Sequence, residues 1–245
     1  MDEIEIKILE YSFRGDHDQR SLAALQVVLR KTAYDLVSVR GISYRALKHL
    51  EPTLLKMGYN MYIDPTWRSV TAKWRYTCLS VLYVKNSIAF SQIAGSFGFD
   101  TVLRYVCGKF EFGNHSIFYR TSHIPSVDDT RSQLSRQIER KENMLGAEIE
   151  YQNEHMSDCS ISAGDFNGSA DDEDCYCQDL YGEFVFRDLM ISESTYEDKQ
   201  SDHVYISDGF ENAGISVEAE VLDKYCMQPT DHKMIAITLK RADCE

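Results

Sequence analysis

The 245-residue sequence contains no apolar run of the about 18 to 20 residues that a membrane-spanning helix needs. Its first residues alternate acidic and apolar side chains, whereas a signal peptide would have a basic stretch followed by an apolar one. Proline and glycine are scarce, at 4 and 13 residues, and 43% of the chain is hydrophobic, which excludes a collagenous or largely disordered protein. We expect a soluble, cytoplasmic protein with a sizeable core and no membrane partner.

Basic residues are also fewer than acidic residues. Lys and Arg number 26 against 39 Asp and Glu, which gives a formal net charge of −13 at pH 7. Nucleic-acid affinity comes largely from basic side chains that neutralise phosphates, so this balance opposes a general capture of polyanions, while a local basic groove stays compatible with it. The seven cysteines are odd in number and include no Cys-x-x-Cys pair, which favours reduced thiols over a disulfide framework.

The first sixty residues alternate between strand and helix patterns. A period of two over 4–11 predicts a strand, and helical spacing of apolar residues follows over 18–31. A short strand is predicted at 34–39, followed by a helix that starts near Ser43 and is interrupted or offset at Pro52. This part of the chain therefore reads as β-α-β-α.

The rest of the chain is richer in strands. Further strands are predicted at 78–84, 101–112, 116–121, 159–163, 204–207, 216–222 and 234–239, and a further helix at 128–145. Turn signals between the first three of these strands predict a meander. No linker rich in Pro, Gly and Ser divides the sequence, so we expect residues 1–245 to form a single α/β or α+β domain.

Two candidate site residues follow the predicted strand at 159–163. Asp165 and Asn167 are two apart and point to one side, while Phe166 between them points to the core. A carboxylate beside an amide suits a phosphate oxygen, a metal ion or an attacking water. The same pair suits an Asx-type turn that closes the strand, and the spacing leaves both interpretations open.

Aspartates and histidines stand at other predicted strand ends. Asp231 and His232 precede the last strand, where both can reach one site, the carboxylate as a cation ligand and the imidazole as a base. Asp202 precedes another strand and has the position of a carboxylate that orients a catalytic imidazole. His123 follows the strand at 116–121. Taken alone, the pair of Asp231 and His232 is weak evidence for a site. Asp202 taken alone suits a polar residue at the surface, and His123 suits a structural histidine.

Four short motifs follow one another along the chain. They are Thr-Ser-His-Ile-Pro-Ser at 121–126, Gly-Asp-Phe-Asn at 164–167, Ser-Asp-His at 201–203 and Thr-Asp-His-Lys-Met-Ile at 230–235. Their order and spacing resemble the endonuclease/exonuclease/phosphatase superfamily, also called the DNase I-like fold, over nearly the whole chain. The resemblance implies a four-layered α/β sandwich, with two packed β-sheets flanked by helices. It also implies hydrolysis of phosphodiesters or phosphomonoesters assisted by Mg²⁺ or Mn²⁺.

The resemblance assigns a role to each matching residue. It makes His232 the base that activates or stabilises the attacking water, Asp202 its orienting carboxylate and Asp231 a metal ligand. In the same way it implies that Asp165 and Asn167 hold the nucleophile and the scissile phosphate. It implies that His123 donates to a phosphate oxygen.

The first two strands depart from the family pattern. Family members have an Asn at the end of the first strand and a Gln-Glu pair at the end of the second, and this sequence has Ser12 and Gly41 in place of the Asn and the Glu. The guanidinium of the neighbouring Arg40 would repel a cation and attract a phosphate. Three explanations stay open. Glu10 or Asp16 supplies a substitute metal ligand, the site works without the usual metal, or the fold serves binding after its chemistry was lost.

These motifs together predict a divalent-metal-dependent phosphoester hydrolase, a nuclease or another phosphodiesterase, that acts on nucleic acid or another phosphoester. Phosphate contacts are expected from Asn167, His123 and Arg40. The alternative is a catalytically silent DNase I-like fold that binds phosphate or a protein partner, and the replacements at Ser12 and Gly41 favour it.

Overall fold

The computed structural model describes residues 4–13, 18–64, 79–93, 104–124, 143, 146, 157–167, 186–189, 194–196, 200–225 and 232–241. The helix expected over 128–145 lies outside these ranges apart from position 143. Within them, no helix is long and apolar enough to cross a membrane.

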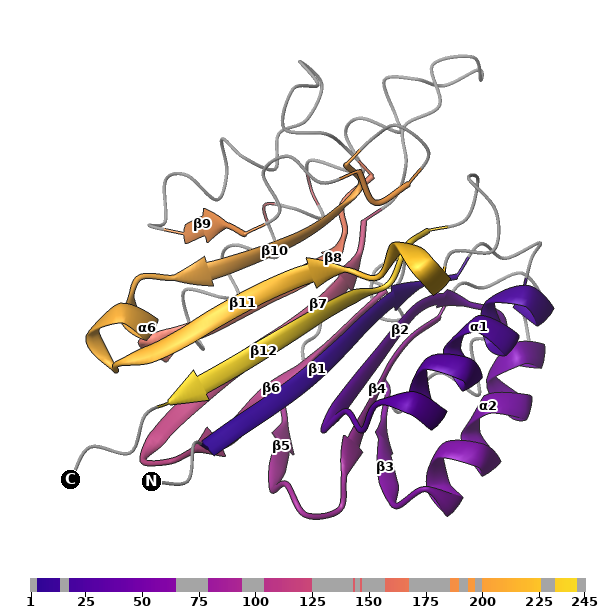
Figure 1. The fold of residues 1–245 in the computed structure, drawn as a ribbon, viewed down its shortest axis with the longest axis horizontal. Coiled ribbons are helices and arrows are strands. Elements are labelled where there is room, and N and C mark those ends of the chain that lie inside the picture. Colours follow the sequence, from indigo (N-terminus) through magenta and orange to yellow (C-terminus); the bar gives the residue numbers. More distant parts are fainter. Residues whose placement is uncertain are drawn as a thin grey trace.

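Two six-stranded sheets make up most of the described fold (Figure 1). The first has the order β11-β12-β1-β2-β4-β3 and contains β1 (Ile4–Ser12), β2 (Leu36–Ile42), β3 (Tyr59–Tyr62), β4 (Leu79–Lys85), β11 (Ile215–Val221) and β12 (Ile235–Arg241). The second has the order β5-β6-β7-β8-β10-β9 and contains β5 (Phe90–Gln92), β6 (Tyr105–Phe112), β7 (His115–His123), β8 (Cys159–Asp165), β9 (Phe186–Asp188) and β10 (Asp202–Ser207). Because β1 is parallel to β2 and β7 to β8, while the other neighbours are antiparallel, both sheets are mixed.

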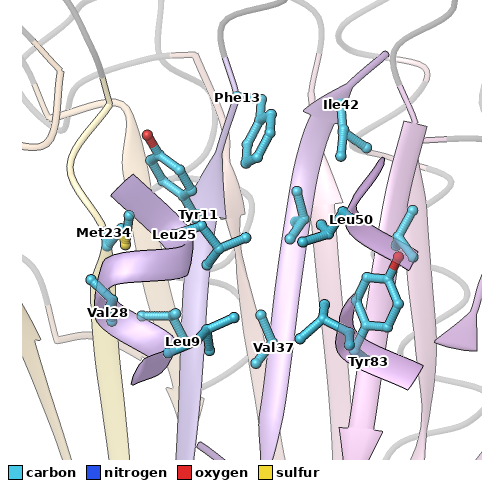
Figure 2. Packing of buried hydrophobic residues seen from close by; sticks show 14 of the residues in the cluster. Leu9, Tyr11, Phe13, Leu25, Val28, Val37, Ile42, Leu50, Tyr83 and Met234 are labelled. Carbon is cyan, nitrogen blue, oxygen red and sulfur yellow. The ribbon is translucent and has the colours of Figure 1, made fainter. Parts of the chain in front are cut away.

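Two helices cover the outer face of the first sheet (Figure 1). They are α1 (Asp18–Lys31) and α2 (Tyr44–Lys56), and α1 has the bounds that the sequence pattern predicts. Leu25 and Val28 of α1, Leu50 of α2, and Leu9 and Val37 of the sheet belong to one buried cluster between these layers (Figure 2). The helices therefore fix β1 and β2 from the side that faces away from the second sheet.

The helix α2 starts where the sequence predicts but does not break at its proline. The Ser43 hydroxyl accepts a hydrogen bond from the backbone N–H of Ala46 at 3.2 Å, which caps the helix start. The helix then continues through Pro52 to Lys56, so the expected interruption is wrong. Pro52 and Lys48 are both exposed, and water can therefore bind the Lys48 carbonyl that loses its helical partner.

A second apolar core lies between the two sheets, and its strands continue into polar residues at one end. Ile8 of β1 and Val204 of β10 are fully buried in this core. With a period of two, the face that carries Ile8 continues to Glu10 and Ser12, and the face that carries Val204 begins at Asp202. The packing of the two sheets thus brings these polar side chains toward one another.

The expected meander is wrong for its first strand. β4 pairs with β2 and β3 in the first sheet, whereas β6 and β7 form an antiparallel pair in the second. The strands β3, β5 and β9 are four, three and three residues long, too short for an alternating pattern to be recognised in the sequence. Two short helical turns were also not predicted; they are α6 (Gly209–Asn212) and η1 (Asp223–Tyr225).

Gly41 lies at an irregular end of β2. The pairing of β2 with β4 shifts between Val39 and Ile42, and Gly41 has a φ of +65°. A Cβ atom at this position would lie 2.5 Å from the backbone oxygen of Phe13 and 3.6 Å from Cε1 of His123. Both the backbone conformation and the close approach of the chain after β1 therefore require glycine here.

The substitution Gly41→Ala should lower the free energy of unfolding by about 3 kcal/mol, since a left-handed backbone and a backbone clash add together. Gly58→Ala is the matched control, because Gly58 has a φ of +82° but open space around its Cβ position. It should cost only about 1–2 kcal/mol. Urea denaturation of both variants measures the difference, and equal losses would show that the approach of Phe13 does not matter.

Candidate active site

Polar side chains from both sheets meet at one edge of the sandwich. It is the edge toward which β1 runs (Figure 1). The C-terminal ends of β1, β2, β7 and β8, the start of β10 and the segment before β12 contribute to it. The side chains that these elements bring together are Glu10, Ser12, Arg40, Thr121, His123, Asp165, Asp202 and His232. Asp231, the metal ligand that the resemblance implies, lies outside the described residues.

A buried guanidinium holds two carboxylates at this edge. Arg40 Nη1 donates to Glu10 Oε2, and Arg40 Nη2 donates to Asp202 Oδ1 at 3.0 Å. The side chains of Arg40, Glu10 and Asp202 are 1%, 0% and 0% exposed. Since Glu10 and Arg40 belong to the first sheet and Asp202 to the second, the ion cluster joins the two sheets. Removing one member of such a cluster would leave an uncompensated buried charge.

Ser12 completes the contact between Arg40 and Asp202. Arg40 Nε donates to Ser12 Oγ at 3.0 Å, and Ser12 Oγ donates to Asp202 Oδ1 at 2.9 Å. The serine hydroxyl therefore accepts from the cation and donates to the anion. In place of the Asn of the family pattern, this chain has a short hydroxyl that serves the ion cluster.

The carboxylate of Glu10 is held by further donors from β7. The Tyr119 hydroxyl donates to Glu10 Oε1, and Thr121 Oγ1 donates to Glu10 Oε2 at 3.2 Å. Both carboxylate oxygens thus have donors within the protein. Tyr119 was not among the predicted site residues, although a period of two places it on the same face of β7 as Thr121 and His123.

The second oxygen of Asp202 contacts His232. Asp202 Oδ2 lies 2.8 Å from His232 Nδ1, and the other ring nitrogen, Nε2, lies 3.7 Å from Asp165 Oδ2. His123 Nε2 lies 3.5 Å from the same Asp165 oxygen. One oxygen of Asp165 therefore faces two imidazoles, and Asp202 is placed to fix the ring of His232.

Asp165 uses its other oxygen to shape the chain after β8. The backbone N–H of Asn167 donates to Asp165 Oδ1 at 3.0 Å, and Asn167 has a φ of +49°. This is the geometry of an Asx turn, one of the two interpretations that the sequence left open. The Asn167 side chain donates to the Ile124 carbonyl at 2.8 Å, which ties the turn to the end of β7. Asp165 thus closes the strand with one oxygen and faces the histidines with the other.

Two residues that the sequence did not suggest support Asp202 and His232. Thr195 Oγ1 accepts hydrogen bonds from the backbone N–H groups of Ser201 and Asp202, at 3.0 and 2.9 Å. The ring of Tyr196 stacks on the imidazole of His232 with centroids 4.5 Å apart. No motif marks these positions, because their contacts depend on how a segment outside the predicted strands folds back onto the site.

Burial and neighbouring charges shift the pKa values of the three carboxyl groups differently. Burial raises the pKa of Glu10 to about 7, against the opposing effect of Arg40. Burial also raises the pKa of Asp165. Burial alone would raise the pKa of Asp202, but His232 and Arg40 together hold it well below its usual range. Of the three carboxyl groups, Asp202 is therefore the one whose ionised form its neighbours stabilise most.

The pKa values of the two histidines shift in opposite directions. Burial lowers the pKa of His123 to about 3, and Arg104 adds to this effect, so His123 is neutral at physiological pH. Burial alone would lower the pKa of His232 as well, but the carboxylates of Asp202 and Asp165 raise it above its ordinary value of 6.5. The two carboxylates thus stabilise the protonated imidazole of His232, the form that a general base reaches when it takes a proton.

Among the described residues, those at the position of the family's metal-ligating Glu do not fit a cation. Gly41 offers no side-chain ligand, and its missing Cβ atom would meet a backbone oxygen. Glu10 accepts hydrogen bonds on both of its oxygens, and Arg40 places a positive charge beside it. A cation there would have to displace the guanidinium.

A second group of metal-ligating types is present in the described part of the chain. Ligand atoms of Asp165, Asp202 and His232 all lie within 4.8 Å of one another. Two carboxylates and an imidazole are donors that a divalent cation accepts. However, His232 Nδ1 and Asp202 Oδ2 already bond to each other, so a cation held by both atoms would displace this hydrogen bond.

Two mixed six-stranded sheets, packed face to face with polar strand ends gathered at one edge, form the DNase I-like architecture of the endonuclease/exonuclease/phosphatase proteins. The fold expected from the sequence motifs is confirmed.

Solved structures of this fold match almost the whole chain. A D. rerio TDP2 humanized by 14 mutations has a TM-score of 0.70 and 12% identity, covering 96% of this chain and 98% of its own. An AP endonuclease from Archaeoglobus fulgidus has a TM-score of 0.66 and 14% identity, covering 95% and 98%. The mannosyl-6-phosphatase Bt3783 of Bacteroides thetaiotaomicron has a TM-score of 0.63 and 14% identity, covering 96% and 99%. No protein-family model and no curated protein matches the sequence.

Replacing Thr195 by Val should lower the free energy of unfolding by about 1–3 kcal/mol, because two buried backbone N–H groups lose their shared acceptor. Thr238→Val is the matched control, since Thr238 is a partly buried residue of β12, where valine suits a strand. Chemical denaturation compares the two variants. A loss no larger than that of the control would contradict the supporting role of Thr195.

Proposed function

We propose that this protein hydrolyses phosphoesters, with His232 as the general base and Asp202 as the carboxylate that orients it. The observation that carries the proposal is the 2.8 Å contact between Asp202 Oδ2 and His232 Nδ1, at the polar edge of a DNase I-like fold. An imidazole held by a carboxylate acts as a general base in acyl transfer, and the same arrangement can take a proton from a water that attacks phosphorus.

The proton path follows from the ring geometry. A neutral His232 that donates Nδ1–H to Asp202 has its lone pair on Nε2, which lies 3.7 Å from Asp165 Oδ2. A water bound beside both atoms gives one proton to Nε2 while its oxygen bonds to phosphorus. The bond from phosphorus to the leaving oxygen breaks in line, and the ionised Asp202 stabilises the imidazolium that forms.

His123 is the phosphate contact that this proposal favours. Its imidazole is neutral, and within the described part of the chain its Nδ1 atom is buried without a hydrogen-bond partner. A neutral imidazole N–H donates to a phosphate oxygen without adding charge to the site. Arg40 is 1% exposed and directed at Glu10 and Asp202, so the phosphate contact expected for it is left out of the proposal.

The substrate class is a phosphate ester, and the neighbours of the fold differ in what carries the phosphate. By their names, one acts as an AP endonuclease and another as a mannosyl-6-phosphatase. The formal net charge of −13 opposes the binding of long polyanions unless basic residues gather locally. Small phosphomonoesters therefore belong in a substrate panel beside nucleic acids.

The second candidate is a catalytically silent fold that binds phosphate or a protein partner. The observation that favours it is the loss of the family metal ligand at Gly41, together with the buried pairing of Arg40 with Glu10. The same substrate panel decides between the two candidates, since a silent fold leaves every ester intact.

Single-turnover assays should detect hydrolysis of at least one member of a panel of plasmid DNA, single-stranded DNA, RNA, abasic duplex and small phosphate esters. Each substrate is tested with Mg²⁺, with Mn²⁺ and with a chelator. His232→Ala should lower the rate by about 10²–10⁴-fold, the usual contribution of a general base. His49→Ala, at an exposed position of α2, is the control and should keep the full rate. Silence of the folded wild-type protein across the panel would refute the proposed function.

The rate should rise with pH through the pKa of His232, because only the neutral imidazole accepts a proton. Asp165→Asn removes a charge that raises this pKa, so the rise should move to lower pH even where the maximal rate falls. Glu218→Gln, an exposed carboxylate on β11, should leave the profile in place. A profile of kcat/KM against pH measures the shift. If the rise in Asp165→Asn occurs at the same pH as in the wild type, or at a higher pH, His232 is not the base.

A further inference from the structure

The cluster of Glu10, Arg40 and Asp202 resembles a metal site in which an arginine side chain stands where the metal ion would be. Two carboxylates from different sheets face one central positive group, at 3.0 Å for Arg40 Nη2 and Asp202 Oδ1. A divalent cation held between two carboxylates is likewise a positive centre between negative groups, with two charges in place of one. Here the guanidinium of Arg40 fills that position.

The surrounding residues suit a guanidinium. Ser12 Oγ accepts from Arg40 Nε at 3.0 Å, and Thr121 Oγ1 lies 3.5 Å from Arg40 Nη1. The three nitrogens Nε, Nη2 and Nη1 therefore donate to three different residues, Ser12, Asp202 and Glu10. Gly41 leaves no room for a competing carboxylate, because a Cβ atom there would lie 2.5 Å from the Phe13 oxygen.

The guanidinium also acts on the base through Asp202. Asp202 accepts from Arg40 and Ser12 on Oδ1 and contacts His232 Nδ1 with Oδ2. Arg40 thus fixes the rotation of the carboxylate that fixes His232, without touching the reacting atoms. It is a positioning residue for the proposed reaction.

We propose that the Arg40 guanidinium takes the place of a divalent cation in this site, so that the protein positions its base without a resident metal ion. This inference deepens the proposed function, and its consequence for hydrolysis rests on that function. The consequence is that hydrolysis persists in the presence of a chelator. The replacement of a metal ion by the Arg40 guanidinium, called the charge replacement below, is tested on the folded protein without any substrate.

Thermal unfolding of the full chain in MgCl₂ or MnCl₂, with NaCl at matched ionic strength as control, provides the test. The wild-type Tm should not rise beyond the NaCl control, since the guanidinium already pairs with both carboxyl groups and occupies the space between them. Arg40→Gln should have a lower Tm that rises saturably by roughly 2–4 °C or more with either metal ion. The double variant with Glu10→Gln should lose this response, because one of the two carboxylates no longer carries charge.

Arg20→Gln, at an exposed position of α1, is the matched control and should unfold like the wild type in all salts. Arg40→Lys keeps the positive charge, and its Tm should stay insensitive to the metals. If Arg40→Gln does not fold, the Tm values of the wild type and of Arg40→Lys, with and without metal ions, still test the inference. A saturable metal-dependent rise in either one overturns the inference, as does a folded Arg40→Gln that ignores both metal ions.

The outcomes separate this inference from the proposed function. Hydrolysis that requires Mg²⁺ or Mn²⁺ would keep the function and overturn the charge replacement. If the Tm values respond to the metal ions as expected but no substrate is hydrolysed, the charge replacement is kept and the proposed function is refuted.

Discussion

The pairing of one buried guanidinium with two buried carboxylates is the constraint on which this site depends. Glu10, Arg40 and Asp202 are almost completely removed from water, and such charges are tolerated only when each has partners. The partners come from β1, β2 and β10, so the charges are satisfied only when both sheets are packed in register. The ion cluster therefore makes the geometry around His232 a property of the whole sandwich and not of one loop.

Most of the fold was predictable because its strands alternate. The period of two in β1 and β10 shows which residues face the core between the sheets, and the polar ends of these strands are on the same faces. The four motifs indicated the order of the site residues. The short edge strands β3 and β9 were missed, since three or four residues show no period.

The sequence could not predict how the site residues contact one another. Arg40 looked like a phosphate ligand, because its charge is visible in the sequence and its partner carboxylates are not. Glu10 is 30 positions from Arg40 and Asp202 is 162 positions away, and only the packing of the sheets brings them together. Thr195 and Tyr196 were missed for the same reason. Tyr119 was within reach of the sequence, because it alternates with Thr121 and His123 on one strand.

The glycine at position 41 makes the present state of the site difficult to reverse. A carboxylate at this position would need a different backbone conformation, and the chain at Phe13 would have to move away. It would also meet a centre that Arg40 already fills. A substitution at position 41 alone therefore adds no usable ligand, so an engineered path to a metal centre at this position has to rebuild the main chain before it can change the chemistry.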